Sequence, residues 1–323
     1  LLNATLAPSM GFLSAYRNVG SVSNSGLELT IDTKNIQTKE FSWTSSFNIS
    51  FNRNKVLSLN DDEPSLASRV NWGNFNNAYP YIAIPGHPIA MFYGHIFDGV
   101  YQYTDFDKVG ESYILKDGVP NNGNAREKIQ PGDIKFKDIN RDGVVNDYDL
   151  TIIGNPNPKH IGGFGNNFQY KNFDLNVFFQ WSYGGDVLNA NRIEFEGGDP
   201  NARTSLNMFA SFANRWTPEN QTNELYRIGG QGPAVYSSRT IEDGSFLRLK
   251  TVSLGYRLPN AWLKKINIKS LRVYASAQNL ITWTRYSGPD PEVSTRPTAL
   301  TPSFDWSPYP RPRTLTLGVD ISF

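Results

Sequence analysis

The chain contains no cysteine, which excludes a thiol nucleophile, a thiolate metal site and a disulfide framework. Its three histidines lie far apart in sequence and leave little material for a histidine-based metal centre. Charge of one sign is also missing: 31 Lys and Arg face 30 Asp and Glu, so no strong field recruits nucleic acid as a partner. No run approaches the roughly 18 consecutive apolar residues of a transmembrane helix, which excludes that means of crossing a membrane.

Enzyme signatures are missing as well. No G-x-S-x-G, H-E-x-x-H or phosphate-binding loop motif occurs. Glu194 and Glu196 stand two residues apart on a charged segment, a spacing more typical of a solvated surface than of an acid/base pair. We therefore predict that the chain is not an enzyme.

A two-residue hydrophobic period recurs along the chain. In residues 41–52, FSWTSSFNISFN, the odd positions are mainly aromatic or aliphatic and the even positions are Ser, Thr or Asn. The pattern returns in GLELTID at 26–32, in FDLNVFFQWSY at 173–183 and in residues 313–323. This period predicts strands with one apolar and one polar face. The phase changes within residues 244–258, which predicts either a β-bulge near Thr251 or a strand that leaves the membrane.

Two all-β architectures fit this alternation, a soluble β-sandwich and a transmembrane antiparallel β-barrel. The patterned stretches reach about ten residues, the length that a tilted strand needs to cross a bilayer, whereas soluble strands have a mode of about five or six. Aromatic residues also stand near the expected strand ends, where the girdles of outer-membrane barrels lie: Trp43, Trp181, Tyr183 and Trp283. We favour the barrel, with its apolar face in outer-membrane lipid and its polar face towards the lumen.

Connection lengths orient this barrel, because outer-membrane barrels have short periplasmic turns and long extracellular loops. Short turns are expected near residues 38–39, 85–88, 171–172 and 259–269, and long loops near 53–76, 104–159, 187–244 and 285–310. The loops are expected to carry short helices, one of them over 199–216. This scheme predicts nine strands, near 20–36, 40–52, 77–84, 89–103, 160–170, 172–186, 245–258, 268–284 and 311–323. Residues 1–7 would then end a tenth strand, and the C-terminus would be periplasmic.

Several ordered blocks of this sequence resemble one known family. They include NVGSVSNSGLELTIDTKNIQTKEFSWTSSFNISFNRNKV, PGDIKFKDINRDGVVNDYDLTIIGNPNPKHIGGFGNNFQYKNFDLNVFFQWSYGGDV, SSRTIEDGSFLRLKTVSLGYRLP, LRVYASAQNLITWTRYSGPDPEV and YPRPRTLTLGVDISF. These blocks resemble the C-terminal barrel portion of the SusC/RagA family of TonB-dependent outer-membrane transporters. The resemblance covers nearly the whole chain.

The resemblance implies that residues 1–323 form about ten strands of a 22-strand barrel. It implies TonB-dependent import of oligosaccharides or peptides, together with a SusD-like surface lipoprotein. The remaining N-terminal part of the barrel, and a plug through which TonB–ExbB–ExbD acts, would be further partners. The chain has no counterpart of that plug or of the first strands. Two alternatives remain open: a self-contained small outer-membrane barrel of the protease type, and a structural or adhesive barrel.

One segment has the spacing of a calcium-binding loop. DINRDGVVNDYD, residues 138–149, places oxygen ligands at positions 1, 3, 5, 9 and 12 and glycine at the sharp turn of position 6. The candidate ligands are Asp138, Asn140, Asp142, the backbone carbonyl of Val144, Asn146 and Asp149. Asp replaces the usual Glu at position 12. The alternative is an Asx-rich turn without metal. A bound Ca²⁺ is expected to order the loop rather than to catalyse a reaction.

Aromatic residues of the long loops are the remaining candidates. Trp72, Tyr286 and Trp306 are predicted substrate contacts, because aromatic faces stack on sugar rings or on peptide side chains. Packing of the loops, or contact with a lid protein, is the alternative role for these rings. Phe323 ends the chain on the apolar phase of the last strand and is predicted to be an assembly signal for membrane insertion.

Overall fold

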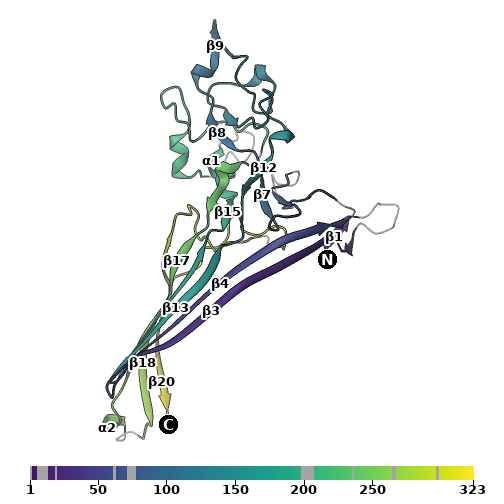
Figure 1. Ribbon diagram of the computed structural model, residues 1–323. Helices are drawn as coiled ribbons and strands as arrows, with labels where there is room; N and C mark the ends of the chain where they lie inside the picture. Colours follow the sequence, from purple (N-terminus) through teal and green to yellow (C-terminus); the bar gives the residue numbers. More distant parts are fainter. Residues whose placement is uncertain are drawn as a thin grey trace.

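The structure is a computed structural model that describes residues 2–5, 14–18, 20–60, 63–70, 78–197, 207–234, 236–263, 267–295 and 298–323. Long strands form one curved sheet, and the segments that join their upper ends fold into a body above it (Figure 1). We call these two parts the main sheet and the head. The head comprises the described residues of 63–159, 186–243 and 285–310. Within the described ranges, no helix has the length and apolar character needed to cross a membrane.

The main sheet has seven strands in the order β20-β18-β17-β14-β13-β4-β3, and all neighbours are antiparallel. Their bounds are β3 Gly20–Gln37, β4 Phe41–Leu59, β13 His160–Tyr170, β14 Phe173–Tyr183, β17 Phe246–Arg257, β18 Ser270–Thr284 and β20 Thr314–Ser322. The strand β1, Leu2–Thr5, pairs with β2, Ser14–Arg17. Among the described residues β20 pairs with β18 and not with β1, so β3 and β20 are the two edges of the sheet.

Strand register keeps the two faces of the main sheet chemically distinct. Phe47 lies opposite Phe164, which lies opposite Phe179, so apolar side chains share one face. Asn48 lies opposite Gly163 on the other face, which is mostly polar. The apolar face is exposed, reaching 86% at Leu317 of β20. An uncovered apolar surface of this extent marks contact with lipid or with a partner.

A β-bulge interrupts β17 where the sequence predicts one. The register of β17 against β14 shifts between Leu249 and Thr251, which leaves Lys250 as the extra residue. The register against β18 shifts at the same place, where Asn279 and Leu280 lie between the partners of Thr251 and Leu249. The shift restores the alternation, because Arg248 before it and Thr251 after it face the same polar side. The predicted bulge is therefore confirmed.

Small sheets and short helices build the head. A four-stranded sheet has the order β12-β7-β6-β5, with bounds Thr151–Gly154, Met91–Gly94, Tyr81–Ala83 and Leu66–Ser68. The other pairings join β8 Phe97–Val100 to β11 Ile134–Phe136, β9 Phe106–Val109 to β10 Ser112–Leu115, and β15 Asp186–Asn189 to both β16 Ile241–Asp243 and β19 Phe304–Asp305. The helix α1 spans Asn191–Gly197, and single 3-10 turns are η4 Tyr103–Asp105, η5 Arg126–Lys128, η6 Asp147–Asp149, η7 Ala210–Asn214 and η8 Ser238–Thr240.

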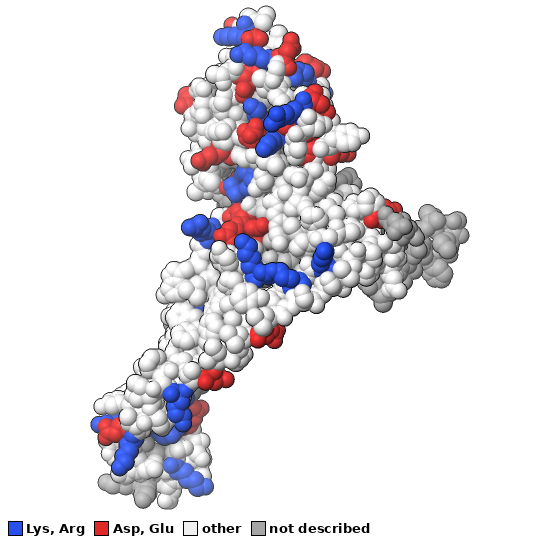
Figure 2. Space-filling model, viewed as in Figure 1, with Lys and Arg blue, Asp and Glu red and all other residues white. Residues whose placement is uncertain are grey.

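Apolar clusters hold the head together. One cluster contains Tyr81, Phe92, Leu188 and Phe304, and a second contains Ile134, Phe136, Trp216 and Tyr226. The long connections therefore form a packed body rather than extended loops. Figure 2 shows that charged side chains gather on this head and at the opposite end of the main sheet, whereas the sheet between is mostly uncharged.

Two of the predicted barrel strands are wrong. Residues 77–84 and 89–103 were expected to run through the membrane and to meet at a periplasmic turn over 85–88. The described residues of these stretches instead form short strands of the head. The Val56 N–H donates to the His87 carbonyl at 2.9 Å, and the Gly86 N–H donates to the Val56 carbonyl at 2.8 Å, near the end of β4 that lies farthest from the turn at 38–40. The physical reason is burial on both faces: Tyr81 and Ile82 are adjacent in sequence and are both buried, whereas a membrane strand alternates.

The other connections agree better with expectation. Residues 38–40, 171–172 and 258–269 join successive strands at the end away from the head, and the last contains the short helix α2, Asn260–Leu263. The helix expected over 199–216 lies partly outside the described residues, and its described part contains only the 3-10 turn η7. Phe209 explains this difference, because its N–H donates to the Phe195 carbonyl at 2.9 Å instead of continuing a helix.

Candidate functional site

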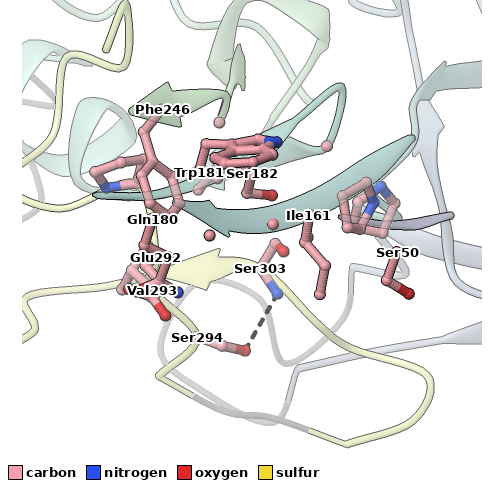
Figure 3. A pocket seen from close by; sticks show the side chains of 18 of the residues that line it. Ser50, Ile161, Gln180, Trp181, Ser182, Phe246, Glu292, Val293, Ser294 and Ser303 are labelled. Carbon is pink, nitrogen blue, oxygen red and sulfur yellow. Dashed lines mark hydrogen bonds between the residues drawn. The ribbon is translucent and has the colours of Figure 1, made fainter. Parts of the chain in front are cut away.

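A hollow of about 690 Å³ lies where the polar face of the main sheet meets the head (Figure 3). Strands β4, β13 and β14 form its wall. In the view of Figure 3, the residues of the segment 292–294 and Ser303 lie below the strand that carries Gln180 and Ser182. Its lining includes Asn48, Ser50, Ile161, Gly163, Phe178, Gln180, Ser182, Asp186, Phe246, Glu292, Val293, Ser294 and Ser303.

Glycine and phenylalanine together shape the wall of the hollow. A Cβ atom on Gly163 would lie 2.8 Å from Cζ of Phe178, so a side chain at this position would displace the ring. Glycine therefore allows the aromatic ring of β14 to lie over the backbone of β13. Phe178 occupies the polar phase of β14, and it supplies an apolar surface among amide and hydroxyl groups.

A buried arginine anchors the segment that borders the hollow. Arg248 of β17 is 2% exposed and faces the polar side of the main sheet. Its Nη2 atom lies 2.6 Å from Oδ1 of Asp290, and its Nη1 atom lies 3.0 Å from Oε2 of Glu292. Its Nε atom donates to Oγ1 of Thr282 on the neighbouring strand at 3.0 Å. The guanidinium thus joins the wall to the segment that follows β18.

A second arginine completes this network. Arg311 lies 3.3 Å from Oδ2 of Asp290 and 2.8 Å from Oε2 of Glu292. Two guanidinium groups therefore share two carboxylates, so the charges are balanced. We call these four residues the arginine anchor. It fixes the two ends of the 290–311 segment, because Arg311 leads directly into β20.

The hollow is suited to binding rather than to catalysis. Glu292 is held by two arginines, and Asp186 accepts a hydrogen bond from the Asn155 backbone N–H at 2.7 Å. Burial raises the pKa of the Asp186 carboxyl. The other lining groups are mainly hydroxyls, amides and apolar side chains, which hydrogen-bond and stack with an uncharged polar chain.

Two of the three aromatic residues predicted to contact substrate, Tyr286 and Trp306, are described, and neither lines the hollow. Tyr286 is 5% exposed, and its hydroxyl donates to the Asp305 carboxylate. Burial raises the pKa of this hydroxyl. Trp306 is half-buried, with its ring stacked on Phe195 at 6.0 Å between centroids. Trp72 lies outside the described residues. Substrate contact by these three residues stays a prediction.

Sequence reasoning missed the residues that shape the hollow. Phe178 is an aromatic residue on the polar phase of an alternating strand, which is a local signal for a special position. The face of the sheet on which the Arg248 side chain lies depends on the bulge in β17, which is an irregularity of the backbone. Neither signal identifies the partner segment, because Asp290 and Glu292 follow more than forty positions later in the chain.

The predicted calcium loop has a tight internal hydrogen-bond pattern. Asp138 accepts from the backbone N–H of Arg141 at 2.6 Å and of Gly143 at 2.8 Å. Asn140 and Asp142 each accept from the N–H two residues onward, at 3.0 and 2.8 Å. Gly143 adopts φ of 85°, a left-handed conformation that favours glycine at the turn.

The last predicted ligand, Asp149, holds the loop through hydrogen bonds to its backbone. Asp149 is fully buried and accepts from the N–H groups of Ile139 at 2.7 Å and Asn146 at 2.9 Å. Across the described part of the chain, no three acidic or histidine side chains gather closely enough to form a ready metal cluster. The oxygen-only donor set still fits a calcium ion, since Asp138, Asn140 and Asp142 keep lone pairs beyond those used by the backbone.

Comparison with known proteins relates the whole chain to one group of receptors. TonB-dependent receptor P3 of Formosa agariphila is 35% identical over 318 residues, which are 97% of this chain and 30% of that protein. TonB-dependent receptor SusC of Bacteroides thetaiotaomicron is 30% identical over 333 residues, covering all of this chain and 29% of SusC. The chain is a relative of part of the SusC-type TonB-dependent receptors. No family model matches it.

Solved structures agree with this relationship. A structure of the RagAB peptide transporter superposes with a TM-score of 0.74 at 25% identity, covering all of this chain and 31% of that one. The RagAB peptide importer in its closed-closed state superposes with a TM-score of 0.73. The SusC/RagA resemblance predicted from the sequence blocks is therefore confirmed. The relatives are receptors and transporters, which also agrees with the prediction of a protein that is not an enzyme. The chain spans about 30% of the length of the curated relatives it matches.

We expect Arg248→Met to free the segment around Asp290 and Glu292. Without Arg248, two carboxylates share the single guanidinium of Arg311, so one negative charge loses its counter-charge. Breaking a buried ion pair in this way costs about 3 to 5 kcal/mol. Hydrogen exchange of residues 288–294 should therefore accelerate. Arg285→Met is the matched control, since Arg285 is exposed and has no ion pair in the part of the chain that is described. Equal exchange in the two variants would contradict the anchoring role.

Proposed function

We propose that residues 1–323 are the C-terminal part of the barrel of a TonB-dependent importer of oligosaccharides or peptides. The relationship to TonB-dependent receptors over the whole chain supports import as the general function. The observation that carries the proposal is the main sheet itself, with one exposed apolar face and one polar face that leads to a hollow beneath the head. Such a sheet is suited to the wall of a membrane channel.

The height of the apolar face matches a bilayer. On that face, β14 runs from Phe173 to Tyr183, and eleven residues at a tilt of about 40° rise roughly 25 to 28 Å. Rings cluster at both limits of this band. At one limit the ring centroids of Phe173 and Tyr256 lie 4.6 Å apart, and at the other those of His160 and Tyr183 lie 5.1 Å apart. These rows have the spacing of the two aromatic girdles of an outer-membrane barrel.

The head is proposed to be extracellular and the C-terminus periplasmic. Short turns at one end and long segments at the other are the arrangement found in outer-membrane barrels. Phe323 follows β20 at the end with the short turns, because Ser322 lies opposite Ser270, which starts β18 just after the third short turn. The same arrangement places the hollow near the extracellular mouth of the lumen.

Further partners follow from the two open edges of the main sheet. Strands β3 and β20 each have one neighbour among the described residues, and unpaired edges are strongly disfavoured in lipid. We propose that the remaining N-terminal part of the barrel pairs with them. A plug within that part would receive the TonB–ExbB–ExbD system, and the head would meet a SusD-like surface lipoprotein. Mass spectrometry of the intact native complex would detect these parts together.

Blocking the hollow is expected to slow import. Ser50→Trp places a large ring on the hollow side of β4, whereas Phe51→Trp exchanges one ring for another on the opposite face. Uptake of labelled oligosaccharide and peptide mixtures should fall several-fold for Ser50→Trp and stay unchanged for Phe51→Trp. Wild-type uptake should also require TonB. Uptake that does not depend on TonB, or no uptake of either class, would favour the structural or adhesive alternative.

We also propose that the 138–149 loop binds Ca²⁺, with Asp138, Asn140, Asp142, Val144, Asn146 and Asp149 as ligands. The spacing of oxygen donors, the left-handed Gly143 and the inward hydrogen bonds of the loop support this assignment. The ion would order this part of the head. No step of import is assigned to it.

Calcium should protect this loop from hydrogen exchange. Asp142→Ala removes one charged ligand, so residues 133–151 should exchange faster and lose their response to added Ca²⁺, while the main sheet keeps its stability. Asp147→Ala is the control, because Asp147 is an exposed acid of the same loop outside the ligand positions. If Ca²⁺ and a chelator give the same exchange in the wild type, the loop is an Asx-rich turn without metal.

Phe323 is proposed as the assembly signal of the barrel. Its ring is 76% exposed and continues the apolar row Leu317, Val319 and Ile321 of β20. Deleting Phe323 should leave the protein in the periplasm, where it is degraded, and reduce the heat-modifiable form in the membrane. Leu315→Ala is the control, since it removes apolar area from the same strand away from the terminus. Near-normal insertion without Phe323 would show that the ring is only an interfacial anchor.

A further inference from the structure

Three basic residues continue the apolar face of the main sheet towards the head. Phe51 of β4 lies on the apolar face opposite Leu27, and the same phase continues with Arg53 opposite Ser25 and Lys55 opposite Ser23. The apolar face therefore changes to a basic surface within two residues. Figure 2 shows basic side chains gathered where the long strands meet the head.

Lys159 brings a third charge to this place from the start of β13. Nη1 of Arg53 donates to the carbonyl oxygen of Lys159 at 2.7 Å, which ties the two segments together. Nζ of Lys159 lies 5.8 Å from the centroid of the Tyr183 ring. Its aliphatic part packs over Gly184, where an added Cβ would lie 2.7 Å from Cγ of Lys159. The positions of two of the charges are thus defined by backbone and ring contacts.

Among the described residues, no acidic side chain forms an ion pair with this cluster. Arg53, Lys55 and Lys159 are exposed, and none of them forms an ion pair with a described residue. Asp186 acts on Lys159 electrostatically, but its carboxylate borders the hollow and accepts from a backbone N–H. Like charges at close range repel one another unless an anion is bound between them.

We propose that Arg53, Lys55 and Lys159, called the basic collar, bind the phosphate groups of a lipid headgroup in the outer leaflet. This inference rests on the proposed function, because it requires the apolar face to lie in the membrane. The collar stands directly above the aromatic row that contains Phe51, His160 and Tyr183. That is the level at which headgroup phosphates lie, and clustered Lys and Arg bind anionic headgroups there.

Neighbouring groups complete the fit to a lipid. Nδ1 of His160 accepts a hydrogen bond from Nε1 of Trp181 at 3.1 Å, so its Nε2 carries the proton and can donate to a phosphate oxygen. Leu27 and Leu29 of β3 are exposed on the membrane side of the collar and offer a surface for acyl chains. Hydrogen-bond donors for phosphate lie above an apolar surface for acyl chains, and a phosphorylated lipid would use both. Free phosphate would use the donors alone.

The test is lipid binding to the full-length receptor in detergent, measured by native mass spectrometry. The collar variant combines Arg53→Gln, Lys55→Gln and Lys159→Gln. The matched control combines Lys34→Gln, Lys39→Gln and Lys269→Gln, which remove the same charge near the opposite end of the main sheet. The probes are phosphorylated lipid A, the same lipid after removal of its phosphates, and inorganic phosphate. Heat-modifiable mobility in membranes shows whether each variant has folded and inserted.

Phosphorylated lipid A should bind roughly a hundredfold more weakly to the collar variant, since each of the three basic groups near an anionic surface contributes about 1 kcal/mol. The control variant should bind like the wild type, and the dephosphorylated lipid should bind weakly to all three. Equal retention of phosphorylated lipid by an inserted collar variant would overturn the collar, while the proposed function would stand. Collar-dependent binding of inorganic phosphate that equals lipid binding would also overturn it. A wild-type protein that never inserts in membranes would instead refute the proposed function. If the triple variant fails to insert, Lys55→Gln alone provides the comparison.

Discussion

Strand register is the constraint on which the rest of this structure depends. Side chains alternate between the faces of a sheet, so a slip of one residue would exchange the two faces completely. Seven strands keep most of their apolar residues on one side and most of their polar residues on the other across six pairings. The hollow, the arginine anchor and the basic collar all occupy places that this alternation assigns. Each of them would lose partners if a strand that carries it moved by one position.

Alternation also decides how much could be predicted from the sequence. The strands around 41–52 and 173–183 were predictable, because one apolar face and one polar face leave a period of two in the residues. Residues 77–103 were assigned wrongly, because Tyr81, Ile82 and Phe92 are apolar for a different reason, namely burial in the head. Length and turn signals alone cannot separate these two causes of apolar sequence.

The candidate site depends on information that is not local. The spacing of the 138–149 loop is contained in twelve consecutive residues and can be read directly. The hollow requires the lateral order of the strands, because Gly163 acquires its role only when Phe178 is its neighbour. The arginine anchor requires still more, since Asp290 and Glu292 reach Arg248 through the folding of a long connection. Sequence patterns therefore indicate which side chains share a face of a strand. They do not indicate which distant segment packs on that face.

The bulge at Lys250 links the sheet to the head. If β17 alternated regularly through Lys250 without a bulge, Arg248 would share the phase of Val252 and Leu254 and would face the apolar side, where an unpaired guanidinium is costly. With it, the guanidinium faces the polar side and binds Asp290 and Glu292. One backbone irregularity thus determines where the 290–311 segment is held. Because that segment also borders the hollow, the shape of the site is set by the register of β17 as much as by its lining side chains.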